Sequence, residues 1–169
     1  MSEDYEISDA EGLTLPGFIA LESGEANVPV AIAWSLPDGR IKHTLIQPAE
    51  EWLDDEEASL GDYGVDELLT LGVSISDVIR ELEADYHGCT LYSADVDQDE
   101  MALARIFEVV NASPCVDTVS AASLYEDHEE WRQQRSELFN EQGLEPGRAE
   151  HDIEVMLTLH MRWLDERDN

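Results

Sequence analysis

The chain has 169 residues and a net charge of −31, from 40 acidic side chains against 9 lysines and arginines. This length is enough for one domain with a real hydrophobic core. So strong a negative charge argues against ordinary duplex DNA binding, because nucleic-acid binders carry a basic surface that displaces counterions, whereas adaptation to a high-salt cytoplasm would explain the acidity.

The chain begins with an acidic segment, residues 1–14, which is poor in large apolar side chains and predicts a flexible leader. Residues 15–169 are expected to form the single domain. The start has neither the basic nor the apolar stretch of a signal peptide, and no run reaches membrane-spanning length. We therefore expect a cytoplasmic protein with no membrane partner.

Three strands are expected next, over residues 18–22, 28–36 and 41–46. The second is almost continuously apolar, which is typical of a strand buried on both faces. The Pro-Asp-Gly-Arg turn at 37–40 predicts that the second and third strands form a hairpin. Residues 48–72 are acidic with isolated apolar anchors, and predict a loop with short helices.

The remaining sequence alternates between helical and strand-like segments. Ser74 predicts the N-cap of a helix that ends near residues 86–88. Strands are expected at 89–93 and 114–119, and helices at about 98–111, 121–142 and 148–164. Three strands followed by this alternation predict an α/β three-layer sandwich, with a mixed five-stranded sheet flanked by helices.

The two cysteines, Cys89 and Cys115, lack metal-ligand spacing and lie in apolar runs, so we expect buried thiols rather than a disulfide. Four of the histidines are scattered singly and are expected to be structural or exposed: His43, His87, His128 and His160.

Several short segments of the chain follow one another in a specific order. They are FIALESG at 18–24, VPVAIAWSLPDG at 28–39, LIQP at 45–48, DYGV at 62–65, LYSADVDQDEMAL at 91–103 and GRAEHD at 147–152. Together they resemble the DEDDh, or DnaQ-like, 3′-5′ exonucleases. The resemblance implies an RNase H-like fold, and hydrolysis of a terminal phosphodiester by two Mg²⁺ or Mn²⁺ ions that four carboxylates hold.

The first motif of that family is Asp-x-Glu on the opening strand, where alternation sends both carboxylates to the same side. The two positions are occupied here by Ala20 and Glu22. The resemblance implies that Glu22 is a retained metal ligand, whereas Ala20 cannot bind metal at the position of the aspartate that bridges both ions. The alternative for Glu22 is a surface acid at a strand end.

The second and third motifs of the family each contain one metal-binding aspartate. Asp99 matches the second motif, with Asp95 and Asp97 as alternatives, and all three could instead be acids favoured at a helix N-terminus. The third motif is His-Arg-Ala-x-x-Asp, in which Asp152 is retained and Gly147 replaces the general base. His151 is an alternative base, but its offset along the helix favours a surface histidine.

The resemblance thus implies Glu22, Asp99 and Asp152 as catalytic and metal-binding residues, with Mg²⁺ or Mn²⁺ as the cofactor. Loss of a bridging ligand and of the base favours an exonuclease-like domain with lost or strongly reduced nuclease activity, retained to bind a protein or a nucleic-acid 3′ end. Two alternatives stay open. One is a weakly active exonuclease on single-stranded nucleic acid, and the other is an acidic protein-binding module or nucleic-acid mimic.

Overall fold

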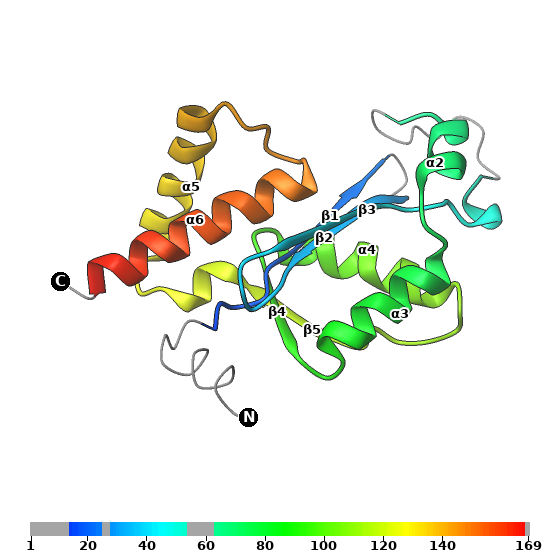
Figure 1. The fold of residues 1–169 in the computed structure, drawn as a ribbon, viewed down its shortest axis with the longest axis horizontal. Helices are drawn as coiled ribbons and strands as arrows, with labels where there is room; N and C mark the ends of the chain where they lie inside the picture. Colours follow the sequence, from blue (N-terminus) through cyan, green and yellow to red (C-terminus); the bar gives the residue numbers. More distant parts are fainter. Residues whose placement is uncertain (1–13, 25–27, 54–62, 168–169) are drawn as a thin grey trace, which may run out of the picture.

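The computed structural model of the protein describes residues 14–24, 28–53 and 63–167. The predicted leader at 1–14 lies outside these residues except for its last position. Helices lie on both sides of a central group of strands, with α5 and α6 on one side and α3 and α4 on the other (Figure 1). The α/β class expected from the alternation is confirmed.

The first three strands form an antiparallel sheet in the order β1-β2-β3. They are β1 (Ile19–Ser23), β2 (Pro29–Ser35) and β3 (Ile41–Leu45). Every residue of β2 is buried, because the strand is central and helices cover both of its faces. The predicted hairpin is confirmed, with Ala33 opposite His43 and Trp34 opposite Lys42.

The expectation of a single five-stranded mixed sheet is wrong. β4 (Thr90–Ser93) and β5 (Asp117–Ser120) form a separate two-stranded parallel sheet. An isolated parallel bridge between Phe18 and Tyr92 links the two sheets, and the Tyr92 amide donates to the Gly17 carbonyl at 2.9 Å. Phe18 directly precedes β1, so this contact joins the start of β1 to β4.

The helices begin where capping side chains are available. α3 (Ile75–Tyr86) is capped by Ser74 as predicted, and α4 (Val96–Glu108) begins two residues before the predicted start because Asp95 caps it. The predicted helix over 121–142 is interrupted. It comprises the 3₁₀ turn η3 (Ala121–Leu124) and α5 (His128–Gln142), which Asp127 caps through the Glu130 amide at 3.0 Å.

The short helices predicted within the acidic segment 48–72 and the predicted last helix are both present among the described residues. Within residues 48–53 and 63–72 the chain forms the 3₁₀ turn η2 (Glu50–Leu53) and the short α2 (Val65–Leu71). The remaining helix, α6 (Ala149–Arg167), packs across β1, β2 and β3.

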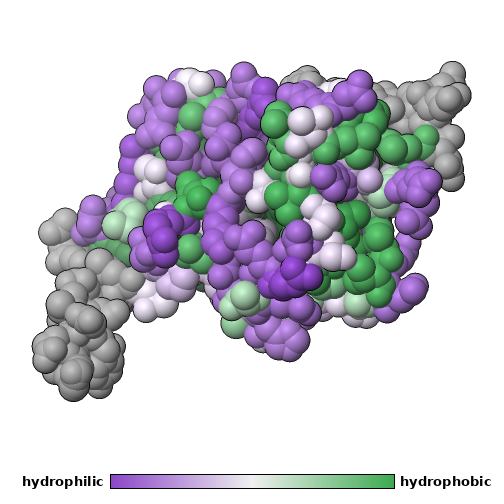
Figure 2. Space-filling model, turned by 45° about the vertical axis from the view of Figure 1, so that its right-hand side comes forward, coloured by the Kyte–Doolittle hydropathy of each residue, from purple (hydrophilic) through white to green (hydrophobic). Residues whose placement is uncertain are grey.

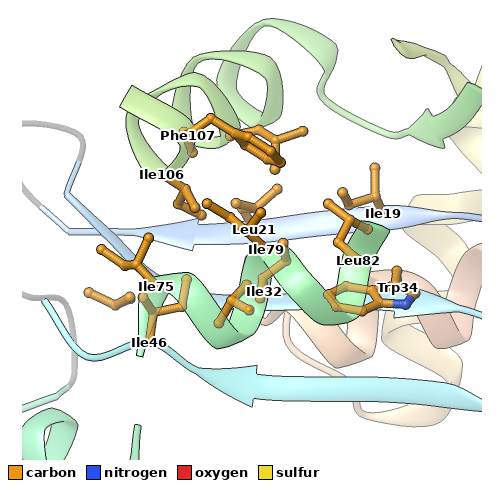
Figure 3. Close-up of a cluster of buried hydrophobic side chains, with 14 of the residues drawn as sticks. Ile19, Leu21, Ile32, Trp34, Ile46, Ile75, Ile79, Leu82, Ile106 and Phe107 are labelled. Carbon is orange, nitrogen blue, oxygen red and sulfur yellow. The ribbon is translucent and has the colours of Figure 1, made fainter. Parts of the chain in front are cut away.

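The sheet separates two hydrophobic clusters. On the α3 and α4 side, Ile19 and Leu21 of β1 pack with side chains of β2, α3 and α4 (Figure 3). On the α5 and α6 side, Phe18 and Ala20 pack with residues of both helices. Alternation along β1 therefore places Ala20 on the side that faces α6.

The surface is mostly polar on the side shown in Figure 2, with hydrophobic side chains gathered toward the right of the view. Large apolar side chains exposed on α2 include Val65, Leu69 and Leu71. The two cysteines are free, as expected, but Cys89 is exposed and Cys115 partly exposed. The prediction that both are buried is wrong: both residues lie outside the strands, Cys89 directly before β4 and Cys115 two residues before β5.

Candidate active site

Glu22, at the end of β1, accepts hydrogen bonds from two other parts of the chain. One carboxylate oxygen accepts from the backbone amide of Ala149 at 2.8 Å, and the other accepts from the hydroxyl of Tyr63 at 3.2 Å. Ala149 is the first residue of α6, so the carboxylate satisfies an amide that has no partner within the helix and lies at the positive end of the helix dipole. Glu22 thus stabilises the start of α6.

We expect Glu22→Ala to lower the free energy of unfolding by about 1 to 2 kcal/mol, because it leaves the Ala149 amide without its acceptor. Glu22→Gln retains a carbonyl acceptor and should cost about half as much. Urea unfolding with EDTA and with Mn²⁺ measures both losses. If Glu22 serves only as a metal ligand, Glu22→Ala will be neutral in EDTA and destabilising only when Mn²⁺ is present.

Asp99 lies on the first turn of α4 and is buried, with 5% of its surface exposed. One carboxylate oxygen accepts from the Leu21 amide at 3.1 Å and the other from the Ser93 hydroxyl at 2.5 Å. Burial raises the pKa of this carboxyl to about 7, against the lowering effect of the two hydrogen bonds. The protonated form of Asp99 is therefore favoured up to a much higher pH than in an exposed aspartate.

The two alternatives to Asp99 occupy other positions. Asp95 is exposed and accepts from the Gln98 amide at 3.4 Å as the N-cap of α4. Asp97 is also exposed. Among the three, Asp99 alone is buried against β1.

Asp152, near the start of α6, pairs with Arg135 of α5. The guanidinium Nη2 donates to one carboxylate oxygen at 2.9 Å, and the two side chains are 26% and 15% exposed. Burial raises the pKa of Asp152, while the Arg135 charge partly offsets that effect. The guanidinium also lies over the Phe139 ring, 4.9 Å from its centre. A protein cation is therefore the direct partner of Asp152.

A cavity of about 230 Å³ brings several of the predicted positions together. Its lining includes Ala20, Asp95, Asp99, Arg135, Gly147 and Asp152. Glu22 does not line it, although its charge contributes to raising the pKa of Asp152. The cavity is thus lined by two of the three predicted carboxylates, Asp99 and Asp152. It is also lined by Ala20 and Gly147, the two positions at which the chain departs from the family pattern.

Gly147 occupies the position of the general base in the family pattern, and its backbone conformation is unfavourable for any other residue. Its φ angle is +94°, in the region that side chains other than glycine rarely adopt. His151 does not replace the base, because its Nδ1 accepts from the Glu145 amide at 3.0 Å and the residue does not line the cavity.

These contacts do not fit a two-metal centre. Each predicted ligand already receives hydrogen bonds or an ion pair from the protein: Glu22 from Ala149 and Tyr63, Asp99 from Leu21 and Ser93, and Asp152 from Arg135. A pair of divalent ions requires ionised oxygen ligands that converge on them. Ala20 and Arg135, by contrast, place a methyl group and a positive charge at this cavity.

Two residues of this site were not identified from the sequence. Tyr63 lies in the DYGV segment, which belongs to the family pattern, but its contact with Glu22 joins residues 41 positions apart. Arg135 is one of few basic residues in an acidic helix. That scarcity is the one available signal, since a cation in a strongly acidic segment is well placed to pair with an acid.

Comparison with known proteins gave no match to any family model and none to any curated protein. The assignment to the exonuclease family thus stays a prediction. Within the part of the chain that the structure describes, no helix has the length and apolarity needed to cross a membrane.

Proposed function

We propose that the chain is an exonuclease-like domain of RNase H-like fold that has lost metal-dependent nuclease activity, or retains it only at a strongly reduced level, and that acts by binding. The observation that carries the proposal is the ion pair between Arg135 and Asp152, in a cavity also lined by Ala20 and Gly147. The guanidinium compensates a carboxylate that would otherwise favour a metal ion.

The arrangement of helices and strands supports the fold assignment. An antiparallel sheet beside a parallel strand pair, with helices on both sides, has the α/β class of that fold, although the five strands form two sheets that a single residue pair bridges. Ala20 and Glu22 share one side of β1, and Asp99 and Asp152 approach from α4 and α6. These are the elements on which the family pattern places its ligands.

The test is a nuclease assay on purified protein with end-labelled single-stranded DNA and RNA and with Mg²⁺ or Mn²⁺. We expect both oligonucleotides to stay intact over long incubation, since general-base catalysis alone is worth about 10² to 10⁴ in rate. Shortening from the 3′ end that Asp152→Asn abolishes would show that the site is active. Shortening that persists in Asp152→Asn would come from a contaminating nuclease.

The charge of the chain favours a protein as the bound partner. A net charge of −31 repels phosphate backbones and attracts basic surfaces, which is also the basis of the nucleic-acid-mimic alternative. A mimic should bind basic DNA-binding proteins at low salt and release them at moderate salt. A partner retained at moderate salt would favour a specific protein-binding domain instead.

A further inference from the structure

A second group of side chains with metal-ligating atoms lies away from the cavity, at the end of α3. Glu83 and His87 are one helical turn apart, and Cys115 comes from the segment that leads into β5. Two backbone hydrogen bonds hold these segments together: the Gly88 amide donates to the Cys115 carbonyl at 2.8 Å, and the Asp117 amide to the Cys89 carbonyl at 3.0 Å. The arrangement therefore follows from the pairing of β4 with β5.

The ligand atoms of these three residues all lie within 4.8 Å of one another. Among the described residues, no other group of three or more such side chains brings its ligand atoms so close together. The predicted exonuclease ligands do not form such a group. Glu83 and His87 are exposed and Cys115 is partly exposed, so an ion has direct access. Small side-chain rotations would bring the three atoms to the separations found around a tetrahedral ion.

The chemistry of the three ligands selects among metals. A carboxylate oxygen, an imidazole nitrogen and a thiolate sulfur together suit Zn²⁺, whereas Mg²⁺ and Mn²⁺ prefer oxygen ligands. The C-terminus of α3 adds a partial negative charge beside Glu83 and His87, which also favours a cation. The ligand atoms and the electrostatic environment thus both favour a bound cation.

We propose that Glu83, His87 and Cys115 form a Zn²⁺ site, with water in the fourth position. The site is independent of the proposed function, because it lies where β4 begins, whereas the exonuclease-like cavity lies beyond the end of that strand. A zinc ion here joins α3 to the start of the parallel sheet. Cys89 is exposed nearby, with its Sγ 3.7 Å from the His87 carbonyl, and serves as the matched control.

Cobalt replacement tests the site, because Co²⁺ bound to a thiolate gives a near-ultraviolet charge-transfer band that carboxylates alone do not. Reduced full-length protein is titrated with Co²⁺ in moderate salt, which suppresses diffuse cation binding to the acidic surface. We expect the band to appear and to disappear when Zn²⁺ is added. Cys115→Ser should abolish it, while Cys89→Ser should keep it.

The other two ligands are tested by affinity. His87→Gln and Glu83→Gln should each weaken Co²⁺ and Zn²⁺ binding by more than about tenfold, with far-ultraviolet circular dichroism confirming that the variants are folded. His43→Gln, in β3, should have no effect. The proposal is overturned if wild-type protein gives no thiolate band, if the band persists in Cys115→Ser, or if Cys89→Ser removes it equally.

Discussion

Between about pH 4 and pH 7, the free energy of unfolding of wild type is expected to fall by about 3 to 4 kcal/mol relative to that of Asp99→Asn. Folding raises the pKa of this carboxyl from 3.8 to about 7, because the group is buried. The folded protein then binds a proton that the unfolded chain releases. The contribution of Asp99 to stability is therefore largest below about pH 4, falls as pH rises to about 7, and is constant above that.

The measurement is urea unfolding of wild type and Asp99→Asn at several pH values. The difference between the two proteins isolates Asp99, because the many other acids titrate in both. Asp97→Asn, which removes an exposed acid on the same helical turn, is the matched control and should follow the wild-type curve. Parallel curves for wild type and Asp99→Asn would mean that the pKa of Asp99 is the same in the folded and unfolded protein. A difference of the opposite sign, in which wild type gains stability as pH rises through about 4, would mean that the folded protein holds the carboxyl ionised, as a metal ligand would be.

Arg135→Met is expected to destabilise the protein by about 2 to 3 kcal/mol above neutral pH. It retains most of the apolar contact with Phe139 but leaves Asp152 as a largely buried carboxylate without its ion-pair partner. The pKa of Asp152 is already raised by burial, and Arg135 opposes that effect. Without the guanidinium this pKa rises further, so the loss should shrink as pH falls and Asp152 becomes protonated.

Two further variants separate this pair from general helix effects. Arg132→Met removes an exposed cation from the same helix and should change stability by less than about 0.5 kcal/mol. Arg135→Met combined with Asp152→Asn should recover most of the loss. If the double variant is as unstable as the sum of the two single variants, the ion pair makes no contribution of its own.

The opening strand was the most predictable part of the candidate site. Alternation alone places Ala20 and Glu22 on one side of β1, and the structure confirms the strand and the position of Ala20 in the cavity. The cap at Ser74 was predictable for a similar reason, since it depends on residues three positions apart. Local spacing determines both features.

The partners of the carboxylates could not be predicted in this way. The Arg135 pair with Asp152 depends on the packing of α5 against α6, and the amide that Glu22 binds is 127 residues away along the chain. The break between η3 and α5 was also missed, because a strongly charged segment gives little apolar periodicity to locate a helix start.

Protein groups, rather than metal ions, are expected to satisfy the three predicted ligands. A crystal soaked in Mn²⁺ and measured for anomalous scattering at the manganese edge tests this directly. We predict no manganese held jointly by Glu22, Asp99 and Asp152, with the Arg135 guanidinium still paired to Asp152. Two manganese ions a few ångströms apart between these carboxylates, with Arg135 displaced, would contradict this expectation.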